Sequence, residues 1–162
     1  MPRDSDLNEP PLPQPGRIWT VDQANRRLEG LREELPRLRA WVVRLRKVHD
    51  ELHRISAFWG KELEAVDNPD REMRDRLNEE WKTLTQRLER EVASLQEEGI
   101  EIKDLESGLI DFYGLVDGEV VFLCWQRGED GVTFYHTLEG GYRNRRPLKA
   151  PSPESAPRRG SR

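Results

Sequence analysis

Apolar residues recur at alternating spacings of four and three between residues 31 and 66, which is typical of a long amphipathic helix with a coiled-coil face. The a and d positions of this face are Leu31, Leu35, Leu38, Val42, Leu45, His49, Leu52, Ser56, Trp59, Leu63 and Val66. A second row, made of Trp41, Val48 and Ile55, lies beside it at g positions. The apolar stripe is therefore wider than one partner helix needs, and we expect a third helix, a sheet or a second subunit to contact it.

Two breaks divide the helical region. Thr20 can N-cap a helix, with Gln23 as its capping-box partner, and Pro36 then either starts a new helix or kinks the first one. We expect a shorter helix over 21–35 ahead of the long one. A second break, "VDNPDREM", precedes a returning helix that Gly99 ends. The short turn predicts that the two long helices form an antiparallel hairpin.

The hydrophobic period changes after residue 99. The runs "EIKDLESGLIDFYG", "EVVFLCWQRG" and "GVTFYHTLEGG" are rich in β-branched and aromatic residues, and Gly and Asp turns separate them. They predict a small antiparallel sheet, and the fold class is α+β. We expect a single domain over 17–148, with 17–99 helical and 100–148 the β module. The Pro-rich arm 1–16 and the basic tail 149–162 are predicted to be disordered.

Charge and cysteine content narrow the function classes. Charged residues make up 36% of the chain and the net charge is −4, yet the stretch from Arg143 to Arg162 holds seven Lys or Arg and one acid. An acidic body with a basic tail does not favour nucleic-acid binding by the body. The one cysteine, Cys124, fits a reducing compartment. No apolar leader or membrane span is evident, so we expect a cytoplasmic protein.

The stretch "HDELH" at 49–53 resembles the zinc-hydrolase pattern H-E-x-x-H. Asp50 stands in place of the glutamate, with a side chain too short to reach a metal-bound water. His49 occupies an a position that faces the partner helix. We therefore expect no metal and no other cofactor, with His49 and His53 as weak candidate ligands.

The β module places polar groups among aromatic residues. Asp111 lies inside the apolar run "LIDFY", and a buried carboxylate needs a partner, which Arg145 or His136 could provide. One interpretation is a structural polar network. The other is a ligand-binding site made of Asp111, His136, Glu139 and Arg145. Strand alternation does not require Cys124 and His136 to share a face, so a thiolate–imidazolium pair is not favoured.

The segments "WTVDQANRRLEGLREELPRL", "KDLESGLIDFYG", "VFLCWQRGE" and "FYHTLEGGYRNRRPL" resemble a bacterial family catalogued as domain of unknown function 2203. The resemblance spans about 17–148. The positions that match its pattern are Asp104, Gly108, Asp111, Cys124, Trp125, Gly128, Glu129, His136, Gly141, Arg145 and Pro147. Tyr113, Tyr135 and Asn144 depart from it, and "HDELH" is not part of it. The resemblance implies one folded unit and no particular chemistry.

Three functions are compatible with these features. The first is a non-enzymatic scaffold or interaction protein that acts through the helical hairpin. It would form a homodimer in which the Trp41 row is buried, and it could also bind another protein. The second is a metal- or small-ligand-binding protein, or an enzyme, with a site around His136. The third is an accessory factor that contacts RNA or the ribosome through the basic tail.

Overall fold

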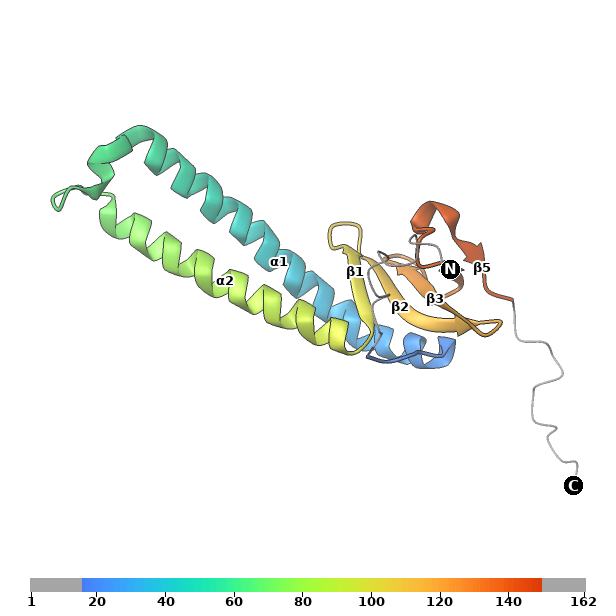
Figure 1. The fold of residues 1–162 in the computed structure, drawn as a ribbon. Coiled ribbons are helices and arrows are strands. Elements are labelled where there is room, and N and C mark those ends of the chain that lie inside the picture. The colour runs from blue at the N-terminus through green and yellow to red at the C-terminus, as the bar shows by residue number, and fades with distance from the viewer. Residues whose placement is uncertain (1–15, 150–162) are drawn as a thin grey trace, which may run out of the picture.

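The computed structural model describes residues 16–149 of the 162-residue chain. Within them, the helices α1 (Val21–Trp59) and α2 (Arg71–Glu97) lie side by side in opposite directions, and the 3-10 helix η1 (Gly60–Glu64) leads from one to the other (Figure 1). The strands that follow are β1 (Ile100–Asp104), β2 (Leu109–Val116), β3 (Glu119–Gln126), β4 (Phe134–His136) and β5 (Arg146–Pro147). A second 3-10 turn, η2 (Tyr142–Asn144), precedes β5. The α+β class predicted from the sequence is confirmed.

The start of α1 is fixed by the capping box that the sequence predicts. The Thr20 hydroxyl accepts a hydrogen bond from the Gln23 N–H at 3.2 Å, and the Gln23 side chain accepts one from the Thr20 N–H at 3.1 Å. The preceding residue, Trp19, donates its indole N–H to the Glu98 carbonyl and its main-chain N–H to the Tyr113 carbonyl, each at 2.7 Å. These bonds hold the entry of α1 against the end of α2 and against β2.

The separate shorter helix expected over 21–35 is wrong, because α1 continues through Pro36 to Trp59. A proline inside a helix removes one main-chain hydrogen bond and costs about 3 kcal/mol. Leu31, Leu35 and Leu38 lie on both sides of Pro36 and are all buried. Each fully buried leucine contributes about 1.5–3 kcal/mol, so packing on both sides holds the helix together across the proline.

The helix face that contacts α2 overlaps only partly with the predicted a/d face, because Leu45 and Leu52 at d positions are half-buried but His49 and Ser56 at a positions are exposed. Val48, predicted to lie outside the contact, is fully buried, and Trp41 and Ile55 are half-buried, whereas His49 is exposed. The a positions in this part of α1 hold the polar residues His49 and Ser56. Turning the g positions inward buries aliphatic side chains in their place, which avoids desolvating an imidazole.

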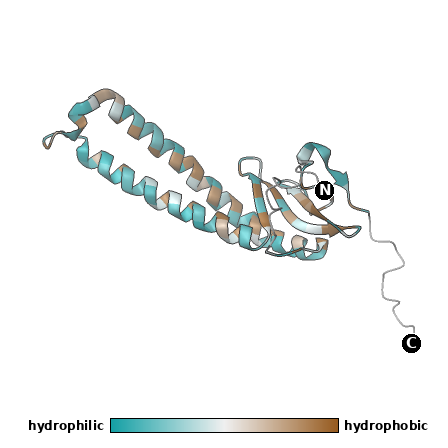
Figure 2. Cartoon of the chain, viewed as in Figure 1, coloured by the Kyte–Doolittle hydropathy of each residue, from teal (hydrophilic) through white to brown (hydrophobic). Residues whose placement is uncertain are grey.

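The sheet is antiparallel throughout, with strands in the order β1-β2-β3-β4-β5 among the described residues. Its helix-facing side packs on α1 and the end of α2. This core contains Ala24, Leu28, Leu31, Leu35, Leu38, Leu95, Ile100, Ile110, Phe112, Val121, Leu123, Trp125 and Val132. In Figure 2 the apolar positions are concentrated on β2, β3 and α1, whereas α2 is largely hydrophilic. The small sheet is therefore stabilised by the first half of α1.

The expectations for the Pro-rich arm 1–16 and the basic tail 149–162 lie outside the described residues, except at Gly16 and Lys149. Among residues 16–149, no helix is both long enough and apolar enough to cross a membrane.

Candidate functional site

The face of the sheet that points away from α1 holds a closed polar cluster made of Asp111, Cys124 and His136. Strand alternation sends Ile110 and Phe112 of β2 into the helix-facing core, so Asp111 between them points to the opposite face. Asp111 is paired in register with Cys124 of β3. Asp111 is 1% exposed and Cys124 is fully buried.

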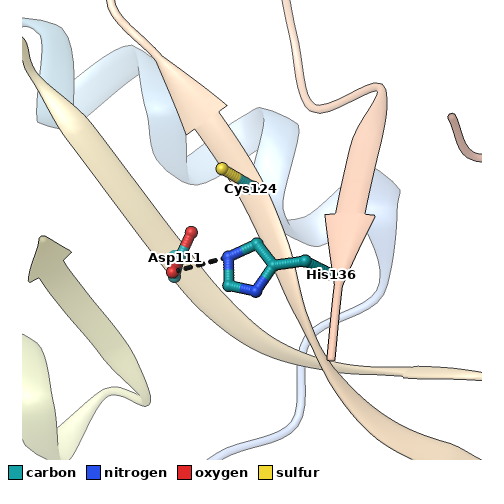
Figure 3. Close-up of side chains that lie close together, drawn as sticks. All are labelled: Asp111, Cys124 and His136. Carbon is teal, nitrogen blue, oxygen red and sulfur yellow. Dashed lines mark hydrogen bonds and ion pairs between the residues drawn. The ribbon is translucent and has the colours of Figure 1, made fainter. Parts of the chain in front are cut away.

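His136 reaches the cluster from β4. It pairs in register with Phe122 of β3, whose side chain points to the same face as that of Cys124, two residues on. The His136 ring packs against the Phe122 ring at a centroid distance of 5.5 Å. Figure 3 shows the side chains of Asp111, Cys124 and His136 pointing toward one another from three adjacent strands.

Both nitrogens of the His136 ring are engaged. Nδ1 lies 2.7 Å from the Thr137 carbonyl oxygen, which can only accept, so Nδ1 carries a proton and donates it. Nε2 lies 3.0 Å from Asp111 Oδ2. That contact requires one shared proton, either on an imidazolium or on a carboxylic acid, and both forms of the pair are neutral overall. Burial raises the pKa of Asp111, and the opposite charge of His136 acts against this rise.

Cys124 is a protonated thiol in this environment. Burial, together with the Asp111 carboxylate, raises its pKa to about 12. A thiol of this kind is not a nucleophile at neutral pH, and neither imidazole nitrogen is free to accept its proton. A Cys–His catalytic pair is therefore not supported by the geometry.

One oxygen of the cluster remains unsatisfied. Asp111 Oδ1 is buried, and no nitrogen or oxygen donor among residues 16–149 reaches it; the weakly donating Cys124 thiol lies beside the carboxyl. A buried acceptor without a partner costs about 1–3 kcal/mol, so this atom calls for an explanation.

An aromatic and ionic layer lies beside the cluster. Arg145 Nη1 donates to Glu129 Oε1 at 2.8 Å, and its guanidinium stacks over the rings of Phe134 and Tyr142 at 4.5 and 4.0 Å. Glu129 also accepts from the Gln126 N–H through its other oxygen. Of the two partners expected for Asp111, His136 forms the hydrogen bond, and Arg145 pairs with Glu129.

The structure thus brings together only some of the ligand-site residues predicted from the sequence. Asp111 and His136 are in direct contact, and Arg145 is tied to Glu129 beside them. Glu139 lies exposed in the turn after β4, and its side chain makes no hydrogen bond or ion pair with any residue the structure describes. Cys124 was not among the predicted site residues. The register of "VFLCW" against "FYH" could have placed it there, because Phe122 opposite His136 puts Cys124 on the same face.

The "HDELH" histidines lie elsewhere, on the surface of α1. His49 is exposed; its ring stacks on that of His53 at a centroid distance of 6.5 Å and lies tilted against that of Trp81 on α2 at 5.9 Å. Within the described part of the chain, the only group of three side chains arranged to hold a metal ion is Asp111, Cys124 and His136.

A second candidate surface is at the far end of the helices. We call residues 41–87 the distal arm, because the buried residues of α1 and α2 in the sheet-packed core lie outside this range, although the half-buried Trp41 packs against that core. A groove of about 770 Å³ lies along the distal arm, with Ile55, Phe58, Met73 and Leu77 among its lining residues. Phe58 is 79% exposed and Met73 is 46% exposed. The bidentate ion pair of Arg44 with Glu80, at 2.6 and 2.8 Å, crosses between the helices beside this groove.

The fold and these two features define an α+β protein with a projecting pair of helices and a small sheet that encloses a polar cluster. The chain belongs to the family described as uncharacterized conserved protein (DUF2203), whose model matches residues 17–148. This match confirms the resemblance seen in the sequence. Searches of curated proteins and of solved structures found no match.

Proposed function

We propose that the protein is a non-enzymatic scaffold or interaction protein of the cytoplasm that associates with a second copy of itself through the distal arm. The observation that supports this most directly is the apolar groove. Phe58 and Met73 border it with 79% and 46% of their surfaces exposed, on helices that the sheet does not cover. Exposed apolar surface of this kind marks interaction sites in folded proteins.

The charges around the groove favour a second copy as the partner. Its rim is lined by three basic and three acidic side chains, which are Arg44, Arg54, Arg76, Glu51, Asp70 and Glu80. In a twofold-symmetric interface each patch meets itself, so basic groups of one copy can face acidic groups of the other. Two distal arms would then pack as four helices. Burial of each large apolar side chain in that interface contributes up to about 1.5–3 kcal/mol.

This partner surface replaces the one inferred from the sequence. The Trp41, Val48 and Ile55 row was expected to remain exposed until a dimer buried it, but α2 already covers Val48 completely. Phe58 and Met73, nearer the tip of the helices, are the exposed residues instead.

The state of the cluster residues agrees with a non-enzymatic role in a reducing compartment. Cys124 is free and buried, and both ring nitrogens of His136 are occupied. Binding of an organic ligand by Asp111, His136, Glu139 and Arg145 finds less support, because Asp111 and His136 are enclosed and Glu139 lies apart. The basic tail proposed to contact RNA lies mostly outside the described residues.

Light scattering coupled to gel filtration tests the self-association. The wild-type protein at tens of micromolar is expected at about 38 kDa, twice the 19.0 kDa of one chain. A Phe58→Ser, Met73→Ser double variant is expected at the mass of one chain. Leu115→Ser is the matched control, because Leu115 is 54% exposed but lies on β2 outside the distal arm. A monomeric wild type, or a dimer that the double variant leaves intact, would contradict the proposal.

A further inference from the structure

We propose that Asp111, Cys124 and His136 form a binding site for one divalent transition-metal ion, with zinc as the ion that fits its ligands best. This inference is independent of self-association through the distal arm. It concerns the other end of the molecule, and it assigns a role to the most enclosed polar groups that the structure describes.

The ligand chemistry fits zinc. The three side chains offer one imidazole nitrogen, one thiolate sulfur and one carboxylate, the three ligand types that proteins use for Zn²⁺. One ligand atom from each lies within 4.8 Å of the other two. Ligand atoms around a tetrahedral zinc ion are roughly 3.3–3.7 Å apart, given bonds of about 2.0–2.3 Å. Small side-chain rotations are therefore enough to close the site around an ion.

The orientation of His136 is that of a metal ligand. Its Nδ1–H donates to the Thr137 carbonyl at 2.7 Å, which leaves Nε2 as the nitrogen that points into the cluster and can bind an ion once the proton shared with Asp111 has left. Histidines that bind zinc are usually held in this way, with the second nitrogen donating to a carbonyl or carboxylate. Thr137 thus selects the tautomer that a metal requires.

Asp111 supplies the second, independent observation. Its Oδ1 is buried, and among the described residues its one neighbouring donor is the weakly donating Cys124 thiol. A metal ion between the three side chains would satisfy this oxygen. If both carboxylate oxygens bind, the cluster provides four donor atoms, namely Nε2, Sγ, Oδ1 and Oδ2, and no water molecule is required.

The charges also balance. In the empty cluster the thiol is neutral, and the Asp111–His136 pair shares one proton and is neutral overall. When Zn²⁺ binds, the thiol proton and the shared proton leave for solvent, and the ion then faces one thiolate, one carboxylate and a neutral imidazole. The net charge of the site is zero before and after. Arg145 acts on the Cys124 thiol against the rise in pKa that burial causes, and its own charge is paired with Glu129, so the layer beside the cluster adds no net charge.

Cobalt substitution gives the sharpest test, since Cys124 is the one cysteine of the chain. Full-length protein is unfolded in guanidinium with a chelator, refolded with Co²⁺ in place of the chelator, and separated from free metal by gel filtration. We expect one retained Co²⁺ per chain and a near-ultraviolet thiolate-to-cobalt charge-transfer band. Any such band must come from Cys124. Zinc added in excess is expected to remove it.

Variants assign the ligands. Cys124→Ser is expected to abolish the band and to lower retained cobalt at least tenfold. His53→Ala, which removes the surface histidine pair on α1, is the control and is expected to leave both readouts unchanged. Circular dichroism checks that each variant has refolded, and the wild-type band decides the question even if Cys124→Ser does not fold. Absence of retained cobalt in the wild type, cobalt without the thiolate band, or loss of binding in His53→Ala would overturn the proposal.

Discussion

At the scale of single residues, the position of Asp111 is decided by strand alternation and not by its polarity. Ile110 and Phe112 are both fully buried in the core on one face, and this fixes Asp111 on the other. Asp111 is enclosed there, and His136 is its one side-chain hydrogen-bond partner among residues 16–149 that acts through a nitrogen atom. The pair is neutral as a unit, which is why the sheet tolerates it without access to water.

Because the pair is neutral, we expect two substitutions to lower the free energy of unfolding by different amounts. In Asp111→Asn the new amide N–H can donate to His136 Nε2, so the free energy of unfolding should fall by about 1 kcal/mol or less. His136→Ala leaves a second Asp111 oxygen without a partner and opens a cavity beside Phe122. We expect it to lower that free energy by about 2–4 kcal/mol. Urea unfolding at pH 7 with a chelator present measures both values without a contribution from metal. Equal losses would show that the proton between Nε2 and Oδ2 is not what holds the pair.

At the scale of elements, the sequence predicted the α+β class and the antiparallel sheet, but it divided α1 at Pro36 and placed the helix contact only partly on the right face. The Thr20 capping box, the change of period after Gly99 and the turn glycines are local signals, and the structure agrees with them. The contact between α1 and α2 is not a local property. Leucines at a and d positions made that face look continuous, yet His49 and Ser56 interrupt it. Leu45 and Leu52 at d positions stay half-buried, and Val48 and Ile55 on the neighbouring row complete the aliphatic contact.

The residues of the candidate site could also be predicted only in part from the sequence. Asp111 was recognised as needing a partner because its neighbours are apolar, and His136 was one of the two partners considered. The choice between His136 and Arg145 depended on register, since only the pairing of Phe122 with His136 decides which side chains meet. Cys124 was considered together with His136 and left out of the predicted site for that reason. Spacing along a strand gives the face of a residue, but the register between strands is set by the whole sheet.

Substitution of Pro36 tests how strongly packing stabilises α1. It lies inside α1 and is exposed, so replacing it with alanine should restore a main-chain hydrogen bond without loss of core contacts. We expect Pro36→Ala to raise the free energy of unfolding by about 1–3 kcal/mol. Thermal or urea unfolding measures the change. A loss of stability would mean that the proline is needed to shape α1 around the sheet. Ala40→Pro, also exposed and one turn further on, is the control and should be strongly destabilising.

Arg27 joins the two helices near the sheet and predicts a dependence of stability on pH. Its guanidinium donates to Glu34 at 2.8 and 3.0 Å and to Glu98 at 2.9 Å. The hydrogen bonds from Arg27 hold the pKa of Glu34 below its ordinary value. A carboxyl whose pKa is lower in the folded state adds stability above its unfolded pKa, and that stability is lost as the pH falls through the folded value.

Arg27→Met should therefore lower stability at pH 7 by roughly 0.5–1 kcal/mol, a modest amount because the pair is partly exposed. The difference between wild type and variant should shrink as the pH falls from about 4.3, the ordinary pKa of a glutamate carboxyl, through the lower pKa that Glu34 has in the folded state. Melting temperatures across pH 3–7 measure it. Arg44→Met, which breaks the more exposed pair with Glu80, is the control and should have a smaller effect. A difference that does not change with pH would assign the role of Arg27 to packing alone.

At the scale of the whole molecule, stability is unevenly distributed. The first half of α1 and the end of α2 share one core with β1, β2 and β3, while the distal arm depends on the contact between its two helices (Figure 1). Trp41, Leu45, Leu52 and Ile55 are only half-buried there, and the buried apolar side chains among the described residues of the distal arm are Val48, Leu63 and Leu77. Segments with few buried apolar contacts open at lower free energy than the core that they extend from.

Hydrogen exchange measures this difference and also responds to self-association. In dilute protein, amides of the distal arm should exchange faster than those of β2, β3 and the first half of α1. If a second copy covers the groove at Phe58 and Met73, protection of the distal arm should increase with protein concentration, because association stabilises the closed form by mass action. Protection of the sheet should remain constant.

The Phe58→Ser, Met73→Ser variant should keep fast exchange in the distal arm at every concentration. Uniform protection of the distal arm and the core in dilute wild-type protein would show that the two helices are a stable unit by themselves, and the exposed groove would then not reflect a missing partner.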